Sequence, residues 1–303
     1  MFQIPEYFVT LPADNLYLIL LFPVAMTHTP KVSIITIGRN NREGYARTLE
    51  SVVTQTCRDY EWIVIDGAST DGSVELLREH EAEITRLVSE PDTGIFNAMN
   101  KGIALARGEY CNFMNSGDAF HAPDVLERAV PRLQGKDFYV GHQVSPNGRP
   151  AFLPAPREVT AYALVNKALT HQGAFIRTEL LKVRPFNEKY TLVADREQMV
   201  YEMLVGNASY ERLDFVVADF DGTGVSGNPA FKAQYNAQWD DALHTLFSPR
   251  VADLLCGGSR FQRKVRYALE KENLAERDWK ILRNALKALP GDLWKSLTRR
   301  KKG

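Results

Sequence analysis

The sequence predicts an α/β fold in which helices flank a mixed, mainly parallel sheet, followed by a helical, basic C-terminal extension. From residue 31 onward, short runs rich in β-branched residues alternate with helical stripes of apolar residues. Polar segments containing glycine or asparagine follow the strand-like runs, where α/β proteins place their functional loops. The length of 303 residues and the hydrophobic content of 45% suffice for one large core or for one domain with an appendage.

The first half of the chain is predicted to contain four strands, each followed by a helix. Strands are expected at 31–37, 61–65, 86–88 and 110–114, and helices at 42–55, from 70 or 71 to about 84, at 95–106 and at 123–133. In the first helix Tyr45, Leu49 and Val52 share one apolar stripe. Pro123 suits the first turn of the last helix, because a proline lacks only an N–H that a helix start leaves unbonded.

The second half has a mixed pattern. Strands are expected at 138–144, 173–176 and 210–220, a proline-rich connection at 151–156, a helix from about 195 to 206, and helices from about 230 onward. We divide the chain into an N-terminal extension (1–29), a main domain (30–228) and a helical, basic C-terminal region (229–303).

Two features bear on the compartment. The apolar run from Leu16 to Met26 is too short for a membrane span and lacks the basic flank of a signal peptide. It is either an upstream extension from a misassigned start or a short packed or membrane-touching segment. The three cysteines, Cys57, Cys111 and Cys256, are far apart and lack metal-site spacing, so we expect buried thiols and a cytoplasmic protein.

The most informative stretch is Ser89 to Gly102 with its sequel, Gly108-Glu109-Tyr110 and Asn115-Ser116-Gly117-Asp118. A polar loop leads into a helix, then into a strand that ends in Asn, Ser, Gly and Asp. This order resembles the inverting family 2 glycosyltransferases of the GT-A fold. It is similar in particular to the colanic-acid type of exopolysaccharide enzyme, which shares the forms Glu-Pro-Asp-x-Gly-Ile and Asn-Ser-Gly-Asp. The resemblance covers residues 31–226 and implies a GT-A, Rossmann-like sheet.

The resemblance places the nucleoside at the ends of the first two strands, near Thr36, Arg39 and Asp66. A carboxylate at a strand end accepts hydrogen bonds from the N–H and O–H groups of a base and ribose. Alternatively, Asp66 only caps the turn before Thr70. Gly67 stands where the commonest family form has a second acid, so a direct carboxylate contact to the base from that position is lost.

The resemblance also implies roles on the diphosphate side. Asp118 is the expected ligand of a divalent cation, Mg²⁺ or Mn²⁺, with Asn115 as a neutral helper, because such ions prefer oxygen ligands. The family's acids at positions 115 and 117 are absent, and the motif in isolation would be an ordinary turn.

The loop and helix at 89–102 line the donor site in the resembled family. Asp92 is expected at the sugar or ribose, and Asn97 or Lys101 at the phosphate. Helix capping is the alternative interpretation of Asn97.

Asp195 matches the family's general base, which takes a proton from the acceptor hydroxyl while the diphosphate leaves from the opposite side. The alternative interpretation of Asp195 is that it caps a helix. Glu197 is the other candidate for the general base. His171 and Gln172 resemble a recurring family pair that lines the donor or acceptor site, although a lone histidine is as often a buried structural one. Residues 222–226 resemble a flexible glycine loop near the end of the family's catalytic domain.

Together these features predict an inverting transferase that moves a hexose-type sugar from a nucleotide-diphosphate sugar to a glycan or lipid-linked glycan, in surface polysaccharide synthesis. Residues 260–303 contain 14 Lys or Arg and 5 Asp or Glu, a net charge of +9. With Trp294 and Leu297 they suit an anionic membrane surface at the inner face of the cell membrane, although a solvated tail is the alternative. No nucleic-acid partner is expected.

Two other classes remain open. One is a non-catalytic nucleotide-sugar-binding partner of an assembly complex. The other, a dinucleotide-dependent oxidoreductase, is disfavoured because no Gly-x-Gly-x-x-Gly follows the first strand.

Overall fold

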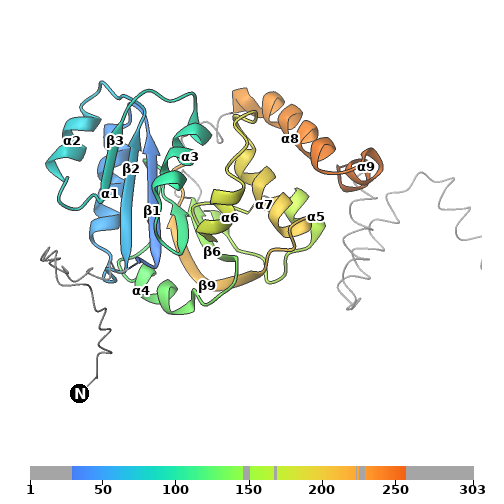
Figure 1. The fold of residues 1–303 in the computed structure, drawn as a ribbon, viewed down its shortest axis with the longest axis horizontal. Coiled ribbons are helices and arrows are strands. Elements are labelled where there is room, and N and C mark those ends of the chain that lie inside the picture. The colour runs from blue at the N-terminus through green and yellow to red at the C-terminus, as the bar shows by residue number, and fades with distance from the viewer. Residues whose placement is uncertain (1–28, 146–150, 167–168, 223, 225–228, 257–303) are drawn as a thin grey trace, which may run out of the picture.

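The computed structural model describes residues 29–145, 151–166, 169–222, 224 and 229–256 (Figure 1). The predictions for the N-terminal extension, most of the glycine loop and the basic tail from residue 260 lie outside these residues. Among the described helices, none combines the length and the apolar composition needed to cross a bilayer.

One mixed sheet runs through the molecule in the order β3-β2-β1-β4-β8-β6-β9-β5, with β7 paired to β6. The parallel half consists of β1 (Val32–Gly38), β2 (Tyr60–Asp66), β3 (Arg86–Ser89) and β4 (Tyr110–Phe113). The mixed half consists of β5 (Ala119–Phe120), β6 (Phe138–Ser145), β7 (Ala151–Leu153), β8 (Ala174–Arg177) and β9 (Tyr210–Asp219). Strand β8 runs antiparallel to β4, so it joins the two halves.

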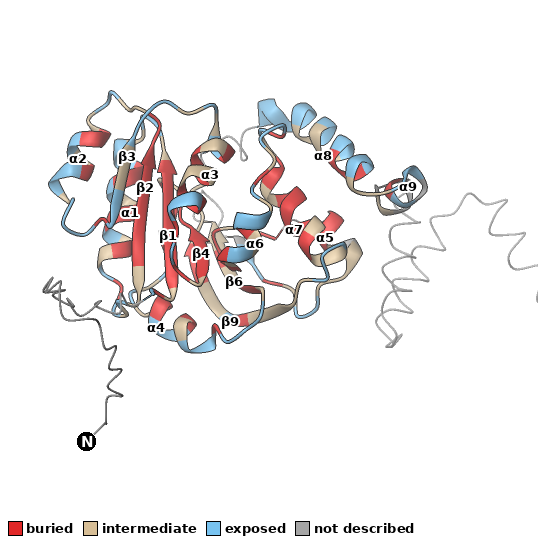
Figure 2. Ribbon diagram, in the orientation of Figure 1, coloured by how far each residue is buried: buried red, intermediate tan, exposed pale blue. Residues whose placement is uncertain are grey.

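Helices cover both faces of the sheet. They are α1 (Arg42–Val53), α2 (Ser73–Glu79), α3 (Ile95–Leu105), α4 (Val125–Ala129), α5 (Ala161–Asn166), α6 (Thr178–Val183), α7 (Ala194–Leu204), α8 (Lys232–Leu246) and α9 (Pro249–Cys256). One core cluster packs α3, α6 and α7 on one face, and the other packs α1, α2 and α4 on the opposite face. Figure 2 shows β1 and β2 buried along their length, which explains their continuous apolar runs.

The structure confirms most of the predicted elements and corrects several. Strand β7 forms where a proline-rich connection was expected, because Ala151–Leu153 pairs with the end of β6. The helix expected at 123–133 is the short α4 followed by a 3₁₀ turn at Val130–Arg132, where Pro131 has no N–H to continue the helix. Helix α2 begins only after Gly72, whose φ is 89°, and ends at Glu79. The short elements β5, α5 and α6 were not predicted.

Of the two cysteines described as free, Cys111 is buried as expected, and burial raises the pKa of its thiol to about 12. Cys57 is half-buried.

A buried carboxylate anchors the edge of the sheet opposite the functional loops. Glu61 accepts hydrogen bonds from Ser33 Oγ at 2.6 Å, from the N–H and Nε of Arg107 at 2.5 and 2.9 Å, and from the N–H of Gly108 at 3.1 Å. Burial opposes its ionisation, but the bonds from Ser33 and Arg107 outweigh it and lower the pKa of Glu61. This carboxylate therefore ties β1 and β2 to the turn that precedes β4.

We expect Glu61→Ala to lower the free energy of unfolding by about 3 kcal/mol, because it leaves several buried donors without an acceptor. Urea unfolding measures this free energy in the variant and in the unchanged protein.

The pKa of Glu61 is lower in the folded state than in the unfolded state. The stabilisation by Glu61 is therefore present above its unfolded-state pKa, and it should fade as the pH falls through its folded-state pKa. The matched control is Glu109→Ala, which removes a half-exposed partner of Lys31 and should change stability by less than about 1 kcal/mol. Equal losses in the two variants would contradict the anchoring role.

Candidate active site

The loops after the parallel strands meet at one edge of the sheet. Gly38 lies opposite Asp66, and Asp66 lies opposite Ser89, so three strands end at the same level. Backbone bonds connect the loops: Gly67 N donates to Gly38 O at 2.9 Å, and Glu90 N donates to Asp66 O at 3.0 Å. This edge is the candidate active site.

Asp66 is fully buried at this edge. It accepts hydrogen bonds from the N–H of Ser69 at 2.8 Å, from the Ser69 hydroxyl, from Ser89 Oγ at 2.8 Å and from the Tyr45 hydroxyl at 3.3 Å. Both oxygens thus have partners within the protein. This geometry agrees with the turn-capping interpretation of Asp66.

Thr36 lies deeper than expected. Strand β1 continues to Gly38, and Thr36 is fully buried, with its hydroxyl accepting the indole N–H of Trp62 at 2.9 Å. The prediction that Thr36 closes the strand is therefore wrong, because the strand runs two residues further.

Asp92, Gly67 and Arg39 come together from three different loops. A Cβ added to Gly67 would lie 2.5 Å from Asp92 Oδ2, 3.2 Å from Arg39 Cβ and 3.3 Å from Arg39 Cδ. The other oxygen, Asp92 Oδ1, accepts the N–H of Gly94 at 2.9 Å, which fixes the carboxylate. The carboxylate of Asp92 therefore lies beside position 67, where the commonest family form carries its second acid.

Lys101 and Asn97 hold loops in place. Lys101 Nζ lies 2.7 Å from Glu90 and donates to the Pro91 carbonyl at 2.9 Å, next to Asp92. Asn97 Nδ2 donates to Glu188 at 3.1 Å. The N-cap of α3 is Gly94, which makes no side-chain capping bond, but Asn97 Oδ1 accepts the N–H of Thr93, just before the helix, at 3.4 Å. This contact agrees with the helix-capping interpretation of Asn97.

Asp118 is buried after β4. Its Oδ1 accepts the backbone N–H of Asp221 at 2.9 Å, and its Oδ2 accepts Gln172 Nε2 at 3.0 Å. Burial raises the pKa of Asp118, and the bonds from Asp221 and Gln172 only partly oppose this.

Asp195 lies in the first turn of α7, beside His171. His171 Nδ1 is 2.8 Å from Asp195 Oδ2, and His171 Nε2 is 3.2 Å from Asn115 Nδ2. Burial alone would lower the pKa of His171, but the hydrogen bond and charge of Asp195, with the charge of Asp118, raise it. The N-cap of α7 is Val193, so the capping interpretation of Asp195 is wrong.

The rival base, Glu197, is buried on α7 and paired with Arg184 at 2.5 Å. An ion pair in this position leaves Glu197 poorly placed to accept a proton from a substrate.

Asp221 is a site residue that the sequence analysis missed. Besides its bond to Asp118, its carboxylate packs against Gly117: a Cβ added there, at a φ of 104°, would lie 3.2 Å from Asp221 Oδ2. Arg47 lies 3.6 Å from the same carboxylate. The sequence feature that could have identified Asp221 is the position of an acidic residue directly after the predicted strand 210–220.

The oxygens near Asp118 suit a divalent cation in part. Asn115 Oδ1 is buried and has no hydrogen-bond partner among the described residues. Asp118 and Asp221 lie on adjoining loops and, like Asn115, carry side-chain oxygens, the ligand type that Mg²⁺ or Mn²⁺ prefers. In the described part of the chain, no group of three His, Cys, Asp or Glu side chains could hold a metal. An ion here would therefore depend on further oxygens from a diphosphate.

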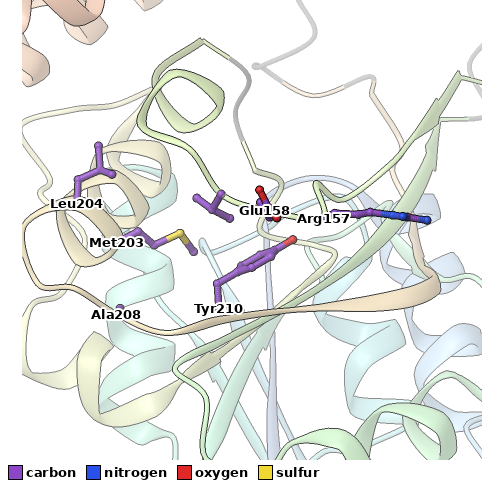
Figure 3. A pocket seen from close by; sticks show the side chains of 7 residues that line it. Arg157, Glu158, Met203, Leu204, Ala208 and Tyr210 are labelled. Carbon is purple, nitrogen blue, oxygen red and sulfur yellow. The ribbon is translucent and has the colours of Figure 1, made fainter. Parts of the chain in front are cut away.

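A separate pocket of about 300 Å³ lies at the far end of α7 from Asp195 (Figure 3). It is lined by Arg157, Glu158, Val159, Met203, Leu204, Ala208 and Tyr210. It contains none of the predicted site residues.

Comparison with known proteins identifies the family. Residues 33–188 match the family described as glycosyl transferase family 2. An uncharacterized glycosyltransferase of Mycobacterium tuberculosis is 34% identical over 212 residues, 67% of this chain and 79% of that protein. A PGL/p-HBAD biosynthesis glycosyltransferase of Mycobacterium bovis is 28% identical over 173 residues, 55% of this chain and 67% of that protein. The chain belongs to glycosyl transferase family 2 and is a glycosyltransferase, which excludes the oxidoreductase alternative.

Solved structures confirm the predicted GT-A fold. Staphylococcus aureus TarS 1-349 in complex with UDP-GlcNAc superposes with a TM-score of 0.58 at 19% identity, covering 86% of this chain and 82% of that one. Glucosyl-3-phosphoglycerate synthase from Mycobacterium tuberculosis, in complex with Mn²⁺, UDP and phosphoglyceric acid, gives 0.51 at 17% identity, covering 70% and 78%.

Proposed function

We propose that this glycosyltransferase moves a sugar from a nucleotide-diphosphate sugar to a hydroxyl of a glycan or lipid-linked glycan, with inversion, in surface polysaccharide synthesis. The observation that carries the proposal is the connection between two acids. Asp195 lies 2.8 Å from His171, and Asp118 accepts a hydrogen bond from the next residue, Gln172, at 3.0 Å. The candidate base and the candidate diphosphate-side acid thus belong to one connected site.

In this proposal the reaction is a single displacement. The acceptor oxygen forms a bond to the anomeric carbon of the sugar, and the bond from that carbon to the diphosphate breaks. Asp195 takes the acceptor proton through Oδ1, the oxygen that does not contact His171. Asp92, beside Gly67 and Arg39, contributes a fixed carboxylate for the N–H or O–H groups of the nucleoside.

A divalent cation, when bound, neutralises the charge that develops on the leaving diphosphate. Asp118, Asn115 and Asp221 are the side chains that would hold it. The structural neighbour glucosyl-3-phosphoglycerate synthase supports this cofactor, because its structure is in complex with Mn²⁺ and UDP.

Membership of a glycosyltransferase family argues against the alternative of a non-catalytic nucleotide-sugar-binding subunit. The feature that would suit that alternative is that both oxygens of Asp118 accept hydrogen bonds from the protein.

We also propose that the protein works in the cytoplasm, at the inner face of the membrane. The basis is the net charge of +9 in residues 260–303, a region outside the described structure. Each basic residue near an anionic leaflet contributes about 1 kcal/mol of attraction.

The purified protein should release a nucleoside diphosphate from one member of a panel of UDP-, GDP- and dTDP-sugars in the presence of acceptor. Asp195→Asn keeps the shape of the side chain but removes its basicity, so kcat should fall by about 10² or more with donor affinity nearly unchanged. No turnover of any donor would favour the non-catalytic alternative. Normal turnover in Asp195→Asn would refute the base assignment.

Removal of divalent cations by a chelator tests whether transfer requires one. EDTA should abolish transfer, and added Mn²⁺ or Mg²⁺ should restore it. Asp118→Asn should raise the metal concentration needed for half-maximal activity by about tenfold or more, because it removes one of the two charged ligands, Asp118 and Asp221. If transfer continues under EDTA, a cation such as Lys101 or Arg39 has to stabilise the leaving group instead.

Gly67→Ala tests the role of Asp92. The new Cβ would approach Asp92 Oδ2 to 2.5 Å, so the carboxylate has to move. We expect donor affinity to fall by about tenfold, the usual effect of misplacing one charged contact. The control is the same change in an Asp92→Ala background, where Gly67→Ala should add little. A full further loss in that background would show that Asp92 is not the group displaced.

A further inference from the structure

The segment immediately before β8 contacts both candidate acids. His171 bonds Asp195 at 2.8 Å, and Gln172 bonds Asp118 at 3.0 Å. The backbone of this segment is itself fixed, because Asn112 Nδ2 donates to the carbonyls of Gln172 and Ala174, each at 3.0 Å. The two side chains therefore extend from a rigid support.

The polar atoms of these two side chains are already engaged by the protein. The imidazole of His171 has two nitrogens, one against Asp195 and the other against Asn115. Gln172 donates to Asp118 and accepts from Gln143 Nε2 at 3.2 Å. Contacts within the protein thus occupy both ring nitrogens of His171 and the amide oxygen of Gln172. That this pair lines the donor or acceptor site stays a prediction.

The contacts also define which nitrogen of His171 carries its proton. A carboxylate only accepts, so Nδ1–H of His171 donates to Asp195 Oδ2, whichever way the amide of Asn115 faces Nε2. No other side-chain bond of Asp195 is found among the described residues. His171 therefore fixes one oxygen of the carboxylate, Oδ2, and does not engage Oδ1.

We propose that His171 is a positioning residue for Asp195: it holds the carboxylate in the orientation in which Oδ1 can accept the acceptor proton. The proposal rests on the assignment of Asp195 as base. A carboxylate at the start of a helix has two freely rotating bonds, and misplacement of a reacting group by about 1 Å can lower a rate by about 10². The contact between His171 Nε2 and Asn115 Nδ2 also connects the imidazole to the loop after β4.

Two substitutions separate the contacts of His171. In His171→Asn the amide nitrogen can take the place of Nδ1 and keep the bond to Asp195. In His171→Gln the longer side chain reaches the place of Nε2 and keeps only the contact with Asn115. We expect kcat within about tenfold of the unchanged protein for His171→Asn, and a loss of about 10² for His171→Gln, with donor KM similar in both.

The assay follows release of the nucleoside diphosphate from the UDP-, GDP- or dTDP-sugar that the panel identifies, and thermal unfolding is measured in parallel. A purely structural role would lower the melting temperatures and the activities of both variants together. Equal losses of kcat, or a change confined to donor KM, would overturn the proposal.

Asp195→Asn distinguishes this proposal from the proposed function. In an Asp195→Asn background, His171→Gln should cause little further loss, because His171 acts through Asp195. A full further loss would show that His171 acts independently and would overturn the proposal. Full activity of Asp195→Asn alone would instead refute the base assignment.

Discussion

The hydrogen bonds of the buried Asp66 carboxylate are the interaction on which the geometry of the candidate active-site edge depends. The carboxylate receives hydrogen bonds from α1 through Tyr45, from its own loop through Ser69 and from the end of β3 through Ser89. Removing a charge from water is unfavourable unless several donors replace the lost hydration, and here they come from three separate segments. Because β3 is fixed in this way, the loop that follows it delivers Asp92 to the side of Gly67.

The parallel half of the fold was predictable because each strand there is a local apolar run followed by a helical stripe. In the mixed half, β5, β7 and the short helices α5 and α6 have too few residues for a periodic pattern, and their hydrogen bonds come from distant segments. The rule that functional residues follow strands selected Asp92, Asp118 and Asp66 as candidates, and the structure places Asp66 at the end of β2, Asp92 on the connected loop after β3 and Asp118 after β4. The rule could not show that Asp66 faces inward or that Thr36 is covered by Trp62, because those outcomes depend on side-chain packing across the sheet.

The electrostatics of this edge set a condition for binding a diphosphate. The carboxylates of Asp66, Asp92 and Asp118 lie at the end of a parallel strand or on a loop that follows one. Two of the nearby cations are already engaged, Arg47 with Asp221 at 3.6 Å and Lys101 with Glu90 at 2.7 Å. Like charges at short range repel strongly where water is scarce. A polyanionic donor therefore requires added positive charge, which is the physical reason to expect a divalent ion beside Asp118.

The close approach of Asp92 to Gly67 also constrains how this chain can evolve. Any side chain at position 67 would meet a carboxylate at 2.5 Å, so the two positions cannot change independently. A lineage that gains an acid at position 67 has to lose or relocate the acid at position 92. An intermediate protein with side chains at both positions is crowded. An intermediate protein with neither acid lacks a carboxylate at this place. The two positions should accordingly vary together among homologues, and an exchange of donor preference would require paired substitutions.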